Sequence, residues 1–133
     1  MTKSIAGTLV LILGLSGMTT AYAEADLERG KQLFQVCVAC HGPSGEGNQL
    51  LNSPANGGQD TWYVVRQMNN FRSGVRGSHP KDLYGMQMRP MAMTLPDAQA
   101  IQDVAAYVGS LQAPSPAKTI DGNAEEGRKT FVN

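Results

Sequence analysis

Cys37-Val38-Ala39-Cys40-His41 is the stretch that decides the fold of this 133-residue chain. Two cysteines separated by two residues, with a histidine directly after the second, show the spacing that attaches haem covalently to a polypeptide. The two thiols add to the haem vinyl groups as thioethers, and the adjoining imidazole ligates the iron. We therefore predict covalent haem attachment at Cys37 and Cys40, with His41 as an axial ligand.

Two other kinds of site share part of this pattern. A redox-active dithiol of the thioredoxin type needs a strand before the motif and a helix after it, whereas here a helical pattern ends at the motif and Gly42-Pro43-Ser44-Gly45 follows. A structural zinc site normally needs four protein ligands, and outside the pentapeptide the sequence holds no cysteine and only His79 among histidines. Both alternatives are therefore weaker than haem attachment.

The first 23 residues have the pattern of a secretory signal peptide. Lys3 precedes an apolar run over residues 5–15, and Ala21-Tyr22-Ala23 supplies small residues for cleavage. We predict cleavage after Ala23 and export to the periplasm, which suits haem attachment outside the cytoplasm. A retained membrane anchor is the alternative, but the run is shorter than the roughly 20 residues that a spanning helix needs.

Residues 24–133 would be nearly neutral, because removal of Lys3 leaves 10 basic and 11 acidic residues. The chain has no basic excess that would indicate nucleic-acid binding. A chain of this length suffices for one small domain, although its apolar core is limited by its surface-to-volume ratio. A buried haem would supply much of the apolar interior.

Helical spacing predicts an all-α domain. A first helix should have Asp26 as its N-cap and run to about Cys40. A second should be capped by Asp60 or Thr61 and run from Trp62 to about Phe71. A last helix should be capped by Thr94 or Leu95, with Pro96 in its first turn, and end near residue 111. We expect irregular chain over residues 42–58, around one edge of the haem, and a methionine-bearing loop over residues 86–93.

This order of elements resembles class I cytochrome c over most of residues 26–112. In that family the first and last helices cross, and a small residue lets aromatic side chains interlock; Gly30 and Phe34 match on the first helix and Tyr107 on the last. The resemblance implies a small helical domain wrapped around one covalently bound haem. The stretches 59–63, 66–74 and 88–95 look more narrowly like the diheme cytochrome c4 branch.

The methionines after residue 24 supply the candidates for the sixth iron ligand: Met68, Met86, Met88, Met91 and Met93. Clustered methionines are by default flexible apolar packing, so we expect one ligand among them. In the c4 pattern the ligand stands seven residues before the leucine that opens the last helix, which is Met88 when counted from Leu95. Met91 is the second choice and Met86 the third. His79 competes, but it lies in a polar loop before Pro80.

Aromatic and basic residues of the second helix are candidates for contacts with the haem. Trp62, Tyr63, Arg66 and Arg72 lie on it, and Arg76 follows shortly after. The default role of such arginines is a solvated surface. The sharper hypothesis is that one guanidinium, with the indole of Trp62 or the hydroxyl of Tyr63, holds a haem propionate.

The last residues repeat the start of the first helix. Residues 123–131 match residues 26–34 at an offset of 97 residues, and Pro114-Ser115-Pro116 is typical of a stiff linker. We therefore predict a cytochrome c domain over residues 24–113, with residues 114–133 forming a linker and the truncated start of a second such domain. A second haem is expected only in a full-length protein. A chance amphipathic tail is the alternative, and in either case we expect residues 114–133 to be poorly ordered.

These observations predict an electron carrier and not an enzyme. If both axial positions are filled, the iron can only cycle between ferric and ferrous states. The resemblance implies shuttling from a quinol-oxidising cytochrome bc complex, or a dehydrogenase, to a terminal oxidase, with membranes contacted only through such complexes. Near-neutral charge predicts weak electrostatic steering and docking through an apolar patch. The rivals are an open-site, peroxidase-like haem enzyme, a haem sensor, and a cytochrome subunit of an oxidase or dehydrogenase complex.

Overall fold

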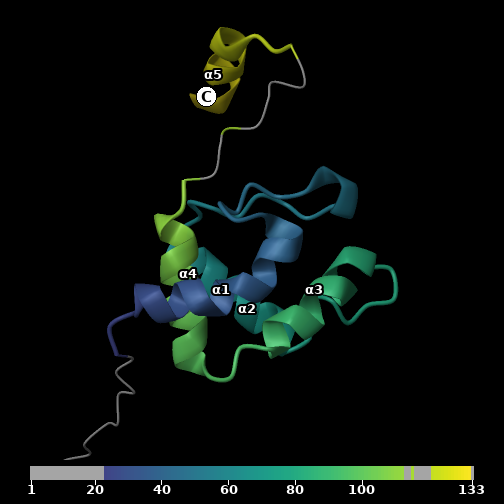
Figure 1. Ribbon diagram of the computed structural model, residues 1–133. Helices are drawn as coiled ribbons and strands as arrows, with labels where there is room; N and C mark the ends of the chain where they lie inside the picture. Colours follow the sequence, from purple (N-terminus) through teal and green to yellow (C-terminus); the bar gives the residue numbers. More distant parts are fainter. Residues whose placement is uncertain (1–22, 113–114, 116–120, 133) are drawn as a thin grey trace, which may run out of the picture.

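The computed structural model describes residues 23–112, 115 and 121–132, and this part of the chain is helical (Figure 1). Its elements are α1 (Leu27–His41), a 3-10 turn η1 (Gln49–Leu51), α2 (Thr61–Arg72), α3 (Leu83–Met93), α4 (Ala98–Ser110) and α5 (Ala124–Val132). One isolated antiparallel bridge joins Asn48 and Ser53, and the described residues form no strand. The predicted all-α class is confirmed.

Parts of two predictions fall outside the described residues. Residues 1–22 of the predicted signal peptide and most residues of the predicted linker are not among the described residues. Among the residues that are described, no helix combines the length and the apolar character needed to cross a membrane.

Helix α1 begins and ends where its sequence predicts. The side chain of Asp26 accepts a hydrogen bond from the backbone N–H of Arg29, so it caps one of the free amides of the first turn. At the other end Gly42 has φ +78°, a left-handed value that glycine adopts without strain, and its N–H donates to the Val38 carbonyl. The pentapeptide therefore occupies the last turns of the helix.

Helices α1 and α4 cross at Gly30. A Cβ atom at this position would overlap the backbone carbonyl of Asp103, so only glycine permits the approach. Beside the crossing, the rings of Phe34 and Tyr107 lie 5.5 Å apart at 59°. The interlocking predicted for Gly30, Phe34 and Tyr107 is confirmed.

The apolar core lies where α1, α2 and α4 meet. Most of its buried residues come from α4, while α1 and α2 contribute one each, and Leu95 covers the end of the cluster. The members are Phe34, Val64, Leu95, Ala100, Ile101, Val104, Ala105 and Val108. Helix α3 packs on α2 and stands outside this cluster.

The methionine-rich stretch is a helix, so the prediction of a loop over residues 86–93 is wrong. The Asp82 side chain accepts from the Gly85 N–H and caps the start of α3, and the methionines that follow are good helix formers. Pro90 lies inside the helix but removes only one backbone donor, the one that would have served Met86.

The predicted cap of the last helix, Thr94 or Leu95, is also wrong, by two or three residues. The N-cap of α4 is Asp97, whose carboxylate accepts from the Ala100 N–H at 2.6 Å. Thr94 instead closes α3, because its hydroxyl donates to the Met91 carbonyl at 2.7 Å. Residues 94–97, which the sequence pattern assigned to the start of one helix, therefore hold the end of α3 at Thr94 and the start of α4 at Asp97.

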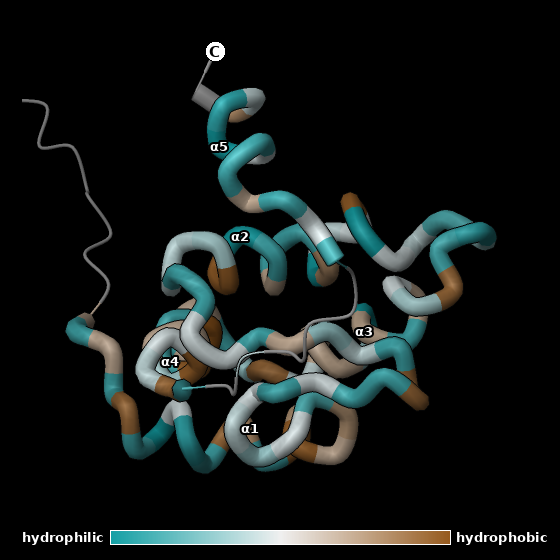
Figure 2. The backbone as a smooth tube through the Cα atoms, turned by 90° about the horizontal axis from the view of Figure 1, so that it is seen from above, coloured by the Kyte–Doolittle hydropathy of each residue, from teal (hydrophilic) through white to brown (hydrophobic). Residues whose placement is uncertain are grey.

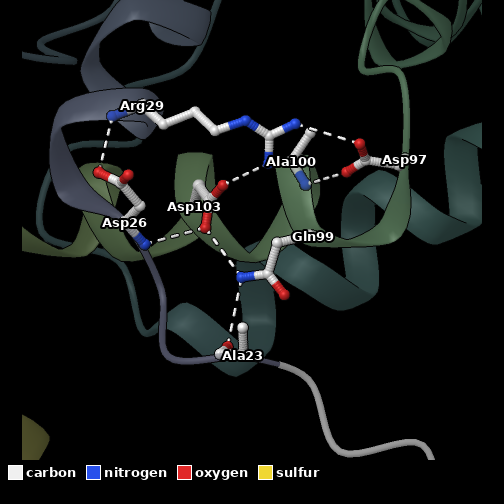
Figure 3. Close-up of polar contacts among 7 residues, drawn as sticks. All are labelled: Ala23, Asp26, Arg29, Asp97, Gln99, Ala100 and Asp103. Atoms are coloured by element: carbon white, nitrogen blue, oxygen red, sulfur yellow. Dashed lines mark hydrogen bonds and ion pairs between the residues drawn. The ribbon is translucent and has the colours of Figure 1, made fainter.

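A polar network fastens the start of α1 to α4 (Figure 3). The Asp103 carboxylate is fully buried and accepts from the Asp26 N–H at 2.9 Å, from Arg29 at 2.7 Å and from Gln99 at 3.0 Å. Arg29 also bridges to the exposed Asp97 at 3.1 Å. Burial by itself raises the pKa of Asp103, but these hydrogen bonds outweigh it and hold the pKa below the ordinary value of 3.8.

Helix α5 contradicts the expectation that the whole of residues 114–133 is poorly ordered. Asn123 Oδ1 accepts from the N–H groups of Glu125 and Glu126, and Lys129 pairs with Glu126 at 2.8 Å. These local contacts cap the start of the helix and add a short-range ion pair to it. Figure 2 shows α5 as largely hydrophilic, and its Phe131 is 92% exposed.

The glycine at the helix crossing gives the first testable prediction. Gly30→Ala should lower the free energy of unfolding by about 1–3 kcal/mol, because the added methyl group forces α1 away from α4. Gly127→Ala is the matched control at the repeated position in α5, where no atom lies within 4 Å. It should leave the denaturation midpoint unchanged. Equal midpoints for Gly30→Ala and the parent would contradict the close crossing.

The buried carboxylate of Asp103 gives the second testable prediction. Asp103→Asn should lower the free energy of unfolding by about 2 kcal/mol, since a charged acceptor of three hydrogen bonds is lost. The lowered pKa means that this stabilisation is complete above the ordinary carboxyl pKa of 3.8 and is lost as the pH falls through the folded-state value. In an acid titration, the free energy of unfolding of Asp103→Asn should therefore fall less than that of the parent protein, because the variant has no carboxyl group to protonate at this position. Asp97→Asn, which keeps the cap and loses only an exposed ion pair, should cost much less.

Candidate haem site

A cavity of about 550 Å³ lies against the end of α1, a volume typical of cofactor sites. Its walls come from four segments: the last turns of α1, the loop around η1 and the chain after it, the inner side of α2, and α3 with the loop before it. Many of the lining groups are apolar or aromatic, among them Val36, Leu51, Val64, Phe71, Tyr84 and Met91.

The cysteines and the histidine of the pentapeptide all line this cavity. Cys37 is half-buried and Cys40 exposed, and neither forms a disulfide. Burial, with a smaller effect of the neighbouring Cys40, raises the pKa of Cys37 to about 11. A redox-active dithiol requires a lowered thiol pKa and commonly lies at the start of a helix. These thiols lie at the end of one, so the thioredoxin-like alternative does not fit.

His41 is held in one orientation. Its side chain is 8% exposed, and its Nδ1 lies 2.9 Å from the carbonyl oxygen of Pro54. A carbonyl only accepts, so Nδ1 carries the proton and Nε2 keeps its lone pair for a metal. The loop that delivers Pro54 is itself tied back to α1, because the Gly47 N–H donates to the His41 carbonyl at 2.7 Å.

The methionines divide into two groups. Met68, Met88 and Met91 line the cavity, whereas Met86 and Met93 are 46% and 53% exposed and do not. Met88 and Met91 are half-buried and stand one turn apart on α3, so the helix presents both to the cavity. His79 is exposed in the loop before α3 and is not part of the cavity wall.

Of the four predicted haem contacts, only Tyr63 lines the cavity. Trp62 is 63% exposed and packs edge-on against Tyr63, and Arg66 is exposed on α2. Arg72 points elsewhere: its guanidinium donates to the carbonyls of Ala92 at 3.1 Å and Leu95 at 2.6 Å. It therefore joins the end of α2 to the end of α3.

Arg76, the third arginine considered as a partner for a haem propionate, does line the cavity. Its guanidinium lies 4.4 Å above the ring of Phe71 and donates to the Gln67 side chain at 2.8 Å. With Tyr63 and Gln67 also in the wall, one sector of the cavity gathers a cation and two hydrogen-bonding groups. Such a sector suits carboxylates.

Some site residues give no signal in the sequence. Pro54 acts through its backbone carbonyl, which any residue has. Asn56 lines the cavity, and its Oδ1 is buried without a hydrogen-bond partner among the described residues.

The residues present fit covalently bound haem. The cavity has room for a flat apolar group, two thiols and a free imidazole nitrogen at one wall, thioethers from another helix, and a polar sector for carboxylates. Soft thioether and imidazole donors are the axial ligands of electron-transfer haem. No other donor set competes, because the described residues hold no group of three or more His, Cys, Asp and Glu side chains able to bind a metal ion.

Comparison with protein families agrees with this donor set. The cytochrome c family model matches residues 27–112, which run from the start of α1 to just beyond α4. The chain is 33% identical to cytochrome c4 of Stutzerimonas stutzeri over 126 residues, which cover 93% of this chain and 58% of that protein. It is 41% identical over 73 residues to the thiosulfate dehydrogenase electron acceptor of Stutzerimonas stutzeri strain A1501, covering 55% of this chain and 32% of the relative.

Solved structures agree on the fold. Reduced recombinant cytochrome c4 from Pseudomonas stutzeri superposes with a TM-score of 0.57 at 30% identity, over 69% of this chain and 53% of that one. The chain thus spans about half the length of the cytochrome c4 relative that it matches.

Proposed function

The chain belongs to the cytochrome c family, and from that premise we propose that it is a periplasmic carrier of single electrons. The observation that supports this most strongly is the set of donors around one cavity. Two thiols and an oriented imidazole stand on the last turns of α1, and thioethers on α3 line the same space.

Each residue then has a distinct role. Cys37 and Cys40 would tether the haem, His41 would bind its iron through Nε2 while Pro54 holds the imidazole ring, and Met88 would supply the second iron ligand. Haem c, when bound, supplies an iron that cycles between the ferric and ferrous states. With His41 and Met88 both bound to that iron, no coordination site would remain for a substrate. Electron transfer through the edge of the cavity is the remaining chemistry.

The partners follow from this chemistry and from the relatives. A quinol-oxidising cytochrome bc complex or a dehydrogenase is the proposed donor, and a terminal oxidase the proposed acceptor. One relative is named as the electron acceptor of a thiosulfate dehydrogenase, which makes a dehydrogenase of that kind a specific candidate for the donor.

We also infer that α5 begins a second domain of the same kind. Helices α1 and α5 start 97 residues apart, as the sequence repeat predicts. Their first turns match in detail: the Gly30 N–H donates to the Asp26 carbonyl and the Gly127 N–H to the Asn123 carbonyl, both at 2.9 Å. Phe131, the counterpart of the buried Phe34, is 92% exposed and would need an equivalent of α4 to cover it.

Ligation by Met88 is testable by spectroscopy of the haem-loaded chain. The ferric protein should show the weak red charge-transfer band of sulfur-ligated haem, and Met88→Ala should abolish it. Met86→Ala is the matched control, because Met86 lies two residues away and outside the cavity wall. Loss of the band in Met91→Ala, with the band kept in Met88→Ala, would contradict this assignment and identify Met91, one turn further along α3, as the ligand.

Carbon monoxide tests the carrier function directly. Ferrous protein with both axial positions filled should bind carbon monoxide slowly at neutral pH, whereas Met88→Ala should bind it fast. Rapid binding by the parent protein would overturn the carrier and indicate an open-site haem enzyme.

The polar sector predicts an effect on the reduction potential. Removing the cation in Arg76→Gln should lower the potential by tens of millivolts, because a positive charge beside the haem carboxylates favours the ferrous state. Arg66→Gln removes the same charge from the outside of α2 and should shift the potential much less. Equal shifts in the two variants would contradict a contact between Arg76 and a propionate.

A further inference from the structure

Helix α3 carries the proposed iron ligand Met88 but lies outside the apolar core. Of its eleven residues only Gly85 and Ala92 are buried, and none belongs to the core cluster. Helix α3 packs on α2, and Figure 1 shows α3 and α4 on opposite sides of the helical body. Because little apolar surface of α3 is removed from water, apolar burial contributes little to holding this helix in place.

Two arginines join α3 to α2. At the end of α2, Nη1 of Arg72 donates to the carbonyl of Ala92 at 3.1 Å and to that of Leu95 at 2.6 Å. In the opposite direction, Nε of Arg89 on α3 donates to the carbonyl of Phe71 on α2 at 3.2 Å. Among the described residues, the hydrogen bonds between α2 and α3 all come from these two side chains. We call Arg72 and Arg89 the arginine clasp.

The arginine clasp binds carbonyl groups that the helices cannot satisfy themselves. Ala92 lies in the last turn of α3 and Phe71 in the last turn of α2, where backbone carbonyls have no partner within the helix. Helix ends of this kind also carry a partial negative charge, which favours a nearby cation. Each helix therefore ends on a guanidinium group that the other helix supplies, and both arginines are half-buried.

The start of α3 is bound to the loop before it. The Asp82 carboxylate accepts from the N–H of Gly77 at 2.9 Å and from that of Gly85 at 3.0 Å. These bonds shape the turn that leads into the helix. The arginine clasp acts at the middle and the other end of α3, where it sets the distance of the helix from α2.

The arginine clasp lies next to the haem cavity without being part of its wall. Neither Arg72 nor Arg89 lines the cavity. Arg89 directly follows Met88 in the sequence, and its acceptor Phe71 is a wall residue. The clasp therefore acts on the backbone that carries the thioether, and not on the haem itself.

We propose that Arg72 and Arg89 are positioning residues, which keep α3, and with it the Met88 thioether, at the iron. This inference rests on the proposed ligation by Met88. A thioether is a soft, uncharged ligand that binds ferric iron less well than ferrous iron. Groups behind a ligand that fix its position decide how firmly it stays bound. Without the arginine clasp, α3 should move away from α2 more often and open the sixth coordination position.

Carbon monoxide measures how often the thioether leaves the iron, because it binds only the fraction of ferrous protein whose sixth position is open. Arg72→Leu removes the donor and the charge and adds no atom that could bind iron. It should bind carbon monoxide about tenfold faster than the parent, or more, since two charge-assisted hydrogen bonds are lost. Arg89→Leu should bind it several-fold faster, because a single, longer bond is lost.

Two further variants separate the hydrogen bonds from the charge. Both bonds of Arg72 come from one nitrogen atom, and a lysine ammonium also carries its three donors on one nitrogen. Arg72→Lys should therefore bind carbon monoxide nearly as slowly as the parent. Arg66→Leu is the matched control, because it removes a cation from an exposed position of α2 outside the cavity wall. It should leave the rate unchanged.

Amide hydrogen exchange of the haem-loaded chain locates the opening. In Arg72→Leu the amides of the last turns of α3 should exchange faster than in the parent, whereas those of α4 should not. Asp103→Asn is the control for a general loss of stability, because the bonds of Asp103 join the start of α1 to α4. It should speed neither the exchange of α3 nor the binding of carbon monoxide.

The outcomes separate the arginine clasp from ligation by Met88. Equal rates of carbon monoxide binding in Arg72→Leu and the parent would overturn the clasp, as would equal acceleration by Arg66→Leu or by Arg72→Lys. If Arg72→Leu takes up no haem, Arg89→Leu decides: a rate equal to that of the parent would overturn the clasp. Fast binding by the parent, without the red charge-transfer band, would instead overturn ligation by Met88 and the carrier function.

Discussion

The close approach of α1 to α4 at Gly30 is the constraint on which the rest of the structure depends. With a hydrogen atom where other residues carry Cβ, the two helices meet backbone to backbone, and Phe34 and Tyr107 interlock beside the contact. The buried carboxylate of Asp103 on α4 accepts hydrogen bonds from the Asp26 N–H and from the Arg29 side chain at the start of α1. These bonds hold the start of α1 against α4. A fixed α1 holds the cysteines and histidine at the cavity.

The cavity combines rigid and irregular parts with different tasks. Helices α1, α2 and α3 set its walls, because their packing decides which side chains face inward. The loop between α1 and α2 contributes side chains to the wall, such as Leu51 and Asn56, and also backbone groups, above all the Pro54 carbonyl on His41. The proposed haem ligand His41 thus gains its orientation from a backbone group of this loop.

Net charge conceals the electrostatics of this molecule. The chain is neutral as a whole, yet segment 61–95 carries five basic residues, on α2, on α3 and in the loop between them, and only one acidic residue. Solvent and salt screen distant charges more than near ones, so a partner at the cavity meets the local sign. Charge arrangement in space, and not composition, governs how a protein surface recognises another protein.

The sequence by itself determined the chemistry and the helical class. A Cys-x-x-Cys-His spacing predicts its donors without reference to the rest of the chain, and the capping of α1 follows local rules that the structure confirms. The crossing residues Gly30 and Tyr107 were expected from the family resemblance, and the structure confirms them as well. Only the tertiary structure decided what depends on packing between segments. It made a helix of the methionine stretch, moved the start of α4 to Asp97, and turned Arg72 away from the cavity and Arg76 toward it. The guanidinium of Arg72 bonds carbonyls about twenty residues away, and such a partner comes within reach only once the helices have packed.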